Sequence, residues 1–569
     1  MGETQKVTGY FFYFMKVRHL IIALSITGML NLLAYLLVVR YDMTDDKRYS
    51  LNEASIQLLE ATDEPIDFIL YLQGDLNAGF RRLQRATHET IEEMDVYSDL
   101  RFTIYDPLSS GSEEFHPESL GMRPIVIHER EHNGRTAQTT VYPYALLRYK
   151  GKKAIIPLLK NTLGMSGEEN LNASIEQMEF VIMEALSLLL QTETPRIAIL
   201  EGHGEPDEAH TYDLMNALSR YFQVDRGQIH SETDNNENLE IDAHLLDGYQ
   251  AILIIAPQTG FSEQERFIID QYLMRGGSIL WAIDGVRLSE EVLQQEGFTP
   301  IIPLDLHLSD MLFRYGVRIN PALVQDIQCL PIPVDVSSNP EQPNLQPMPW
   351  TYAPLLLTSQ GSPITRNLGQ VMSTFVCPIE AVGGEDGIEK RVLLATSTAS
   401  KVTATPGKVD LNDMNPDIEQ FKYQHIPVAV SLEGQFNSAY AHRMQPVGIH
   451  NDEPIRKQSD HTRQIVISSG SILVNELQKN QALPMGYDRY SGMQFSNRDM
   501  IVNCLLWLTD SEGLINLREK DITLRLLNDK RAHDERLTVQ LVSTISPIIL
   551  LALTGGIVVI IRKRKYQLR

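Results

Sequence analysis

Two long apolar stretches stand near the two ends of the chain. Residues 20–39 and residues 537–561 carry no charged side chain over 20 and 25 positions. A helix rises about 1.5 Å per residue, so either stretch would cross the hydrocarbon core of a membrane, which is about 30 Å thick. Pro547 and the pair Gly555-Gly556 are tolerated in such a helix. The pattern therefore predicts two transmembrane helices.

Two alternatives apply to these stretches. Either stretch could instead be a helix buried in the core of a soluble protein, but such helices rarely run so far without a charged residue. A cleaved signal peptide is another for residues 20–39. That stretch exceeds the usual apolar length of about 7–15 residues, and the following VVRYDMTDD offers no small-residue cleavage site. We therefore expect an uncleaved anchor, preceded by a tail of residues 1–19.

Residues 41–192 show the pattern of a small α/β domain. Ser50 is placed to cap a first helix, with Glu53 at the capping-box position. A strand, a helix and a second strand follow, and this order favours a parallel or mixed sheet. Two β-rich runs around Lys150-Gly151-Lys152 predict a hairpin. The expected elements are strands at 66–72 and 101–105, and helices at 81–98 and 170–191.

Residues 195–515 predict a second α/β domain with a doubly wound sheet. Short, almost wholly apolar runs alternate with helical patterns, as in buried parallel strands. Ser262 and Glu265 form a capping-box pair. The expected strands are 196–200, 249–256, 278–283, 391–396, 426–431 and 464–468, and the expected helices are 207–222, 262–275 and 497–509.

Three further segments, two within this region and one after it, look irregular. Residues 331–354 contain seven prolines, which predicts a stiff surface excursion and not a core element. Residues 434–463 look like a polar loop. Residues 516–536 are highly charged and predict a stalk, expected to be helical, that leads into the second span.

Charge orients the chain in the membrane. The net charge is −23, yet residues 562–569 hold five Lys or Arg and no acid. A basic cluster directly after an apolar span marks the cytoplasmic side. Two spans place both ends on one side, so we expect two cytoplasmic tails and a periplasmic region between the spans. Such an acidic surface would repel phosphate backbones, so nucleic-acid binding is not expected.

Motifs for common catalytic chemistry are absent from the sequence. It contains no G-x-x-x-x-G-K-[ST], no G-x-G-x-x-G after a strand, no G-x-S-x-G and no zinc-type spacing. Cys329, Cys377 and Cys504 do not stand at a strand-to-helix elbow, where a thiol nucleophile would be needed. We therefore expect no cofactor, no metal, no catalytic residue and no ATP hydrolysis by this chain.

The sharpest local feature is the run EGHGEP at residues 201–206, just after an expected strand. Open α/β sheets bind ligands at the carboxyl ends of their strands. Two carboxylates around an imidazole could hold a metal or move a proton. The alternative is a tight turn in which glycines supply unusual backbone angles and the histidine bonds the next loop. The candidate ligand-binding residues are Glu201, His203, Glu205 and Asp284, although Asp284 could be an ordinary turn residue.

Three residues in the expected spans are candidates for membrane assembly. Asn31 lies near the middle of the first span, where a carboxamide facing lipid is unfavourable. Gly555 and Gly556 would let another helix approach the second span closely. These features could satisfy each other within the chain or contact a permease.

Several motifs resemble one known family. They are YDMTDDKRYSL at 41–51, YLQGDL and GFRRLQ at 71–84, the turn at 201–206, and FSNRDM with LWL at 495–508. The chain resembles the auxiliary, so-called substrate-binding component of the gliding-motility-associated ABC transporter of the Bacteroidetes (GldG-like). The resemblance implies a non-enzymatic inner-membrane subunit that works with a separate permease and a separate ATPase. It also implies an amidotransferase-like fold for the second domain, without the nucleophile.

Two other functions stay open at this point. One is an anchored periplasmic hydrolase or transferase that uses Glu201, His203 and Asp284. The other is an envelope scaffold. The resemblance supplies no ligand and no site residues.

Overall fold

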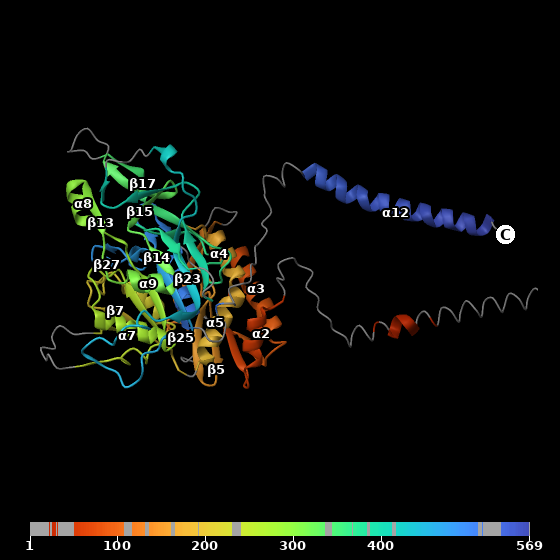
Figure 1. Ribbon diagram of the computed structural model, residues 1–569. Helices are drawn as coiled ribbons and strands as arrows, with labels where there is room; N and C mark the ends of the chain where they lie inside the picture. Colours follow the sequence, from red (N-terminus) through yellow and green to blue (C-terminus); the bar gives the residue numbers. More distant parts are fainter. Residues whose placement is uncertain are drawn as a thin grey trace, which may run out of the picture. The chain divides into compact units, whose positions relative to one another are not determined.

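The computed structural model describes residues 22, 25–29, 31, 50–106, 116–130, 136–160, 165–191, 193–229, 240–335, 344–366, 368–383, 387–411, 417–509, 515 and 536–567. The chain divides into two compact units between Asp521 and Ile522. Both predicted α/β regions fall in the first unit (Figure 1). Most of the expected first span, 20–39, and all of the stalk, 516–536, except residue 536 lie outside the described residues.

The first region is built on a four-stranded sheet in the order β2-β1-β5-β6. Its strands are β1 (Ile66–Leu70), β2 (Leu100–Ile104), β5 (Tyr144–Tyr149) and β6 (Lys152–Pro157). β1 and β2 are parallel, and β5 and β6 form the predicted antiparallel hairpin. Buried side chains of these strands pack against α3 (Ala78–Met94) and α5 (Met178–Leu190) in one core. The expected mixed sheet is confirmed.

Two details of this region differ from expectation. The first helix, α2 (Glu53–Glu60), is capped by Asn52 and not by Ser50: the Asn52 side chain accepts a hydrogen bond from the Ala54 N–H. Glu179 holds this cap in place by accepting from the Asn52 N–H at 2.6 Å. The expected helix at 170–191 is two helices, α4 (Gly167–Glu176) and α5, because Gln177 leaves the helical backbone angles.

The second region contains a ten-stranded sheet. Its main path is β16-β17-β20-β23-β25-β11-β10-β7-β8, with β18 paired to β17. The strands are β7 (Arg196–Glu201), β8 (Gln223–Gln228), β10 (Ala251–Ile255), β11 (Ser278–Ala282), β16 (Cys329–Asp335), β17 (Leu345–Thr358), β18 (Val371–Met372), β20 (Glu389–Ala395), β23 (Pro427–Asn437) and β25 (Gln458–Ile467). The five from β25 to β8 are parallel, and the other pairs are antiparallel. In chain order the parallel strands read 2-1-3-4-5, a doubly wound order.

Helices cover both faces of the parallel half. Alternate residues of β7 and β10 pack into two separate cores, since Ile199 and Leu253 face one side while Leu200 and Ile252 face the other. The first core includes residues of α6 (Tyr212–Leu218) and α10 (Asn497–Thr509), and the second includes residues of α7 (Glu263–Met274) and α9 (Ser309–Tyr315). The doubly wound prediction is therefore confirmed, and α10 has its expected bounds.

Where the structure describes the proline-rich segment, residues 331–335 and 345–354 form strands and not an irregular surface excursion. β16 and β17 form an antiparallel pair through it, and Trp350 and Tyr352 are buried in a small core of their own. Pro331 and Pro333 lie in β16, an edge strand that pairs with β17 alone, and edge strands tolerate proline. The expectation of a polar loop at 434–463 is also wrong at both ends, because β23 extends to Asn437 and β25 begins at Gln458.

Shorter elements complete the first unit. Helix α8 (Glu290–Glu296) lies after β12 (Val286–Arg287). The other short strands are β3 (Ile125–Arg130), β4 (Thr136–Val141), β9 (Ile241–Asp242), β13 (Phe298–Pro303), β14 (Val317–Ile319), β15 (Ala322–Asp326), β19 (Ile379–Ala381), β21 (Ser400–Ala404), β22 (Gly407–Asp410), β24 (Ile449–His450), β26 (Leu477–Gln478), β27 (Gln481–Ala482), β28 (Tyr487–Asp488) and β29 (Met493–Gln494).

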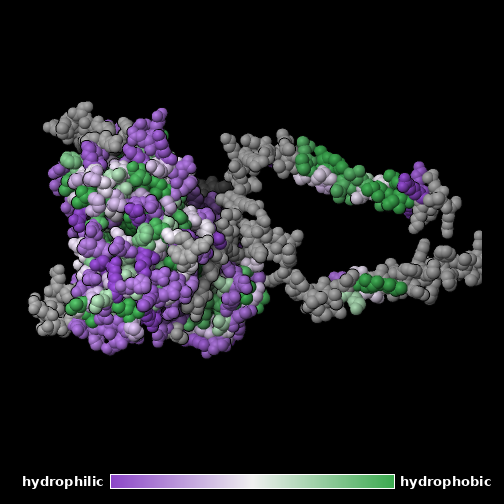
Figure 2. All heavy atoms as spheres, viewed as in Figure 1, coloured by the Kyte–Doolittle hydropathy of each residue, from purple (hydrophilic) through white to green (hydrophobic). Residues whose placement is uncertain are grey.

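The second unit contains one long helix, α12 (Arg536–Gln567). Residues Gln540–Arg564 of it are long and apolar enough to cross a membrane, and none of that window is buried in the protein. Figure 2 shows apolar side chains along most of α12 and a hydrophilic group at its C-terminal end. The structure thus contains the second predicted span as a continuous helix.

Candidate functional site

The run at residues 201–206 forms a tight turn directly after β7. Gly202 has a φ of +114° and Gly204 a φ of +80°, backbone angles that side-chain-bearing residues rarely adopt. In the order 2-1-3-4-5, the chain connections change direction between β7 and β10, and this is where open α/β sheets usually bind ligands. The turn occupies that position.

The ring of His203 lies between two carboxylates. Its Nε2 is 3.2 Å from Glu265 at the start of α7, and its Nδ1 is 3.5 Å from Glu205. The ring stacks on Phe261 with centroids 3.8 Å apart, and only 7% of the side chain is exposed. The carbonyl of His203 accepts from the N–H groups of Gln258 and Thr259 in the loop after β10.

The two carboxylates determine the charge of the ring. Burial lowers the pKa of His203, but hydrogen bonds and charge attraction from Glu205 and Glu265 outweigh it and raise the pKa to about 9. Burial raises the pKa of Glu265, yet His203 and the capping box lower it to about 2. The imidazole is therefore protonated at neutral pH. With both nitrogens directed at carboxylates, it ties the turn to α7.

The other two sequence candidates lie apart from this group. The carboxylate of Glu201 pairs with Arg226 of β8, whose Nε lies 2.6 Å away. Asp284 follows β11 and accepts a hydrogen bond from the Gly470 N–H at 3.0 Å, while burial raises its pKa to about 6. β10 lies between β7 and β11 in the sheet. Across the described part of the chain, no cluster of three or more His, Cys, Asp or Glu residues could hold a metal ion.

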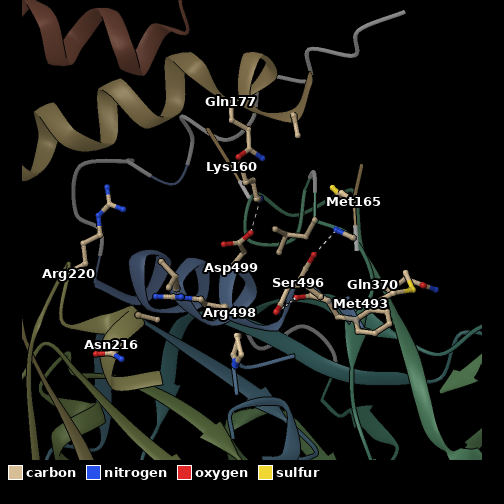
Figure 3. Close-up of a pocket in the computed structure, with 18 of the residues that line it drawn as sticks. Lys160, Met165, Gln177, Asn216, Arg220, Gln370, Met493, Ser496, Arg498 and Asp499 are labelled. Carbon is tan, nitrogen blue, oxygen red and sulfur yellow. Dashed lines mark hydrogen bonds and ion pairs between the residues drawn. The ribbon is translucent and has the colours of Figure 1, made fainter. Parts of the chain in front are cut away.

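A cavity lies away from this turn, between the two α/β regions of the first unit. Its volume is about 750 Å³, within the range of small-ligand pockets. One wall comes from the junction of α4 and α5 with Lys160 and Met165, and the other from α6, β29 and the start of α10. Figure 3 shows Lys160 and Gln177 facing Asp499 across this space.

Each of the three cations that line the cavity is paired with a carboxylate. Lys160 Nζ is 3.1 Å from Asp499, which joins the two regions. Arg498 is 3.6 Å from Asp213, and Arg220 is 3.3 Å from Glu184. The cavity therefore offers three cations whose charge is already balanced.

The cavity was not predicted from the sequence, although one motif contained a signal. The run FSNRDM contributes Phe495, Ser496, Arg498 and Asp499 to the lining. Asn497 is fully buried instead and bonds the Met372 N–H at 2.9 Å, the Met372 carbonyl at 2.8 Å and the Ile472 carbonyl at 3.2 Å. The motif thus fixes the start of α10 at the seam between the regions.

The structure describes few residues around Asn31, Gly555 and Gly556, the three candidates for membrane assembly. Asn31 Nδ2 donates to the Thr27 carbonyl at 2.9 Å, one turn back along the chain. Gly555 and Gly556 lie within α12, and a side chain added at either would meet no described atom within 4 Å. Both glycines therefore leave room for an approaching helix.

Models of two known protein families match most of the folded region. A model described as "ABC-type uncharacterized transport system" (ABC_transp_aux) matches residues 194–504, and one for a domain of unknown function (DUF7088) matches residues 45–148. A curated protein of Borreliella burgdorferi is 20% identical over 289 residues, which are 51% of this chain and 52% of that protein. The chain thus spans about half the length of this curated relative.

Solved structures show only distant likeness. The mmIFT52 N-terminal domain is 14% identical and matches 58% of this chain and 100% of its own, with a TM-score of 0.31. A putative ThuA-like protein from Parabacteroides merdae is 9% identical and matches 59% of this chain and 94% of its own, with a TM-score of 0.28. At these values neither structure bears on function, and the amidotransferase-like fold stays a prediction.

Proposed function

Because the chain belongs to the ABC-type uncharacterized transport system family, matched over residues 194–504, we propose that it is a membrane-anchored, non-enzymatic subunit of an ABC transporter. The observation that carries the proposal is α12, an apolar helix long enough to span a membrane on a chain with this family's folded region. The folded region would bind a ligand or an envelope partner. A separate permease and a separate ATPase would complete the transporter.

The proposed topology has two spans. The N-terminal span, residues 20–39, would join α12 in the inner membrane. Residues 562–565 read Arg-Lys-Arg-Lys and follow the apolar part of α12, which supports a cytoplasmic C-terminus. Both tails would then be cytoplasmic, and the two α/β regions would be periplasmic.

The proposal assigns no chemical step to this chain. The absence of a phosphate-binding motif in the sequence supports a subunit that takes its energy from another protein. The position of His203 supports the same view, because an imidazolium held between two carboxylates is a poor base. A role in gliding motility rests on the resemblance of the motifs alone and is part of the proposal.

Purification from native membranes in mild detergent, followed by mass spectrometry, tests the proposal. We expect a permease and an ATPase to co-purify in fixed ratio with the full chain. A control preparation would carry a tag on an unrelated two-span protein. Recovery of envelope proteins without any ATPase would contradict the transporter role and favour a scaffold. Stoichiometric metal together with hydrolytic activity would favour an enzyme.

A further inference from the structure

The cavity between the two α/β regions, called the seam cavity below, has an unusual lining. Besides its paired charges, it is lined by the side-chain amides of Gln177, Asn216 and Gln370. Within the described residues these amides form no hydrogen bond of their own. A side-chain amide offers both a donor and an acceptor, which is the same pair that a peptide group presents.

The rim of the cavity adds flexible apolar groups. Met165 and Met493 line it from opposite regions, and each is 49% exposed. Thioether side chains adapt their shape to different partners and are common at peptide-binding surfaces. Amides in the walls and thioethers at the rim suit a peptide segment with apolar side chains.

The charged side chains of the cavity give little advantage to a strongly charged ligand. Lys160, Arg220 and Arg498 are each within 3.6 Å of a carboxylate. An anion would compete with these carboxylates for the three cations, so its net gain in charge attraction would be small. A ligand without net charge leaves all three pairs intact.

The aromatic residues argue against a saccharide. Sugar rings usually rest on a flat aromatic face, and the aromatic residues among the described lining are Tyr221 and Phe495. The guanidinium of Arg220 lies over the Tyr221 ring, 5.7 Å from its centroid. Phe495 packs against the core that contains Trp350. Neither ring presents an open platform.

We propose that the seam cavity is a receptor for an extended, uncharged peptide segment of a partner protein. The segment would pair its backbone with Gln177 and Gln370 and place apolar side chains against Met165 and Met493. Because both α/β regions line the cavity, the bound segment would contact both at once. This goes beyond the transporter proposal, since it names the ligand class and would hold whatever protein supplies the segment.

A displayed library of random linear peptides, panned on the full chain in detergent, tests this inference. We expect enrichment of uncharged sequences with apolar residues. A labelled peptide of the enriched consensus should bind about tenfold more weakly to Gln370→Leu, the effect of losing one hydrogen bond. Met493→Glu, which places a charge at the rim, should weaken binding at least as much.

Matched variants outside the cavity serve as controls. Met444 is 90% exposed and Gln360 is exposed, and neither lines the cavity. Met444→Glu and Gln360→Leu should bind the peptide like the original chain, and thermal unfolding should confirm that all four variants fold. No enrichment, or equal affinity in the cavity variants, would overturn the inference. Failure of co-purification would contradict only the transporter proposal, since peptide binding is measured on the isolated chain.

Discussion

His203 is the residue whose surroundings most change the interpretation of the sequence. The run EGHGEP suggested either a reactive group or a tight turn, and the positive φ angles of Gly202 and Gly204 confirm the turn. What the sequence could not show is Glu265, a capping-box residue of α7 that lies 62 positions further along the chain and becomes the second carboxylate on the ring. Contacts between distant segments depend on the assembled sheet.

The first prediction concerns pH. The pKa of His203 is raised from 6.5 to about 9 in the folded chain, so its contribution to stability is complete below pH 6.5 and is lost as the pH rises through 9. The pKa of Glu265 is lowered from 4.5 to about 2, so its contribution is complete above pH 4.5 and is lost as the pH falls through 2. Unfolding temperatures measured across this range should decline above pH 6.5, and His203→Gln should remove most of that decline.

A second prediction compares two substitutions in the turn. His203→Ala leaves Glu205 and Glu265 buried without the cation between them, so we expect a loss of about 3–5 kcal/mol in the free energy of unfolding. Gly202→Val meets only ordinary contacts with Gln228, and its cost comes from the positive φ, roughly 1–3 kcal/mol. Denaturant titration of both variants would test this ranking, and a smaller loss for His203→Ala would show that the ion pairs add little.

At the scale of elements, two neighbouring residues at the start of α10 have different structural roles. Asn497 holds the helix start to Met372 and Ile472, whereas Arg498 makes a half-exposed ion pair. We predict that Asn497→Ala costs about 2–4 kcal/mol, because buried backbone groups lose their partners. Arg498→Ala should cost less than about 1 kcal/mol. Equal losses in denaturant titration would mean that the exposed pair matters more than its geometry indicates.

The two proposed membrane helices lead to a prediction about assembly. Gly555 on α12 leaves open space for a neighbouring helix, and Asn31 retains an acceptor oxygen beyond its bond to Thr27. The double variant Asn31→Leu, Gly555→Leu should enter the membrane normally but recover less permease in the co-purification described above. Ile557→Ala, at an exposed position on the face of α12 opposite Gly555, is the control. Unchanged recovery would move the assembly contact to the folded regions.

Elements with regular apolar patterns were predictable, and those with unusual composition were not. Strands β7, β10 and β11 and helix α10 follow from their apolar runs and have nearly the expected bounds, whereas β25 begins six residues early and the less buried β8 was not expected. The proline-rich strands were missed because proline content usually argues against a strand, and the edge position of β16, where proline is tolerated, is not visible in the sequence. The seam cavity was missed because its walls come from segments more than 300 positions apart, such as Lys160 and Asp499.

At the scale of the whole molecule, the orientation of the chain is the main prediction. If both tails are cytoplasmic, alkaline phosphatase fused after residue 569 should be inactive, and the same enzyme fused after residue 509 should be active. A fluorescent protein that folds only in the cytoplasm should give the opposite pattern. An active phosphatase at the C-terminus would overturn the topology, and with it the periplasmic location of the seam cavity.

The position of β25 in the large sheet has a consequence for biosynthesis. β25 is the strand that joins the parallel half, through β11, to the antiparallel half, through β23. A chain that has emerged only as far as residue 457 therefore holds two half sheets, each with an open edge of unpaired backbone groups. Pairing across such a long stretch of chain is slow. The large sheet is therefore completed only once β25 has reached the same compartment as β11 and β23, and until then the two half sheets stay open to aggregation and proteolysis.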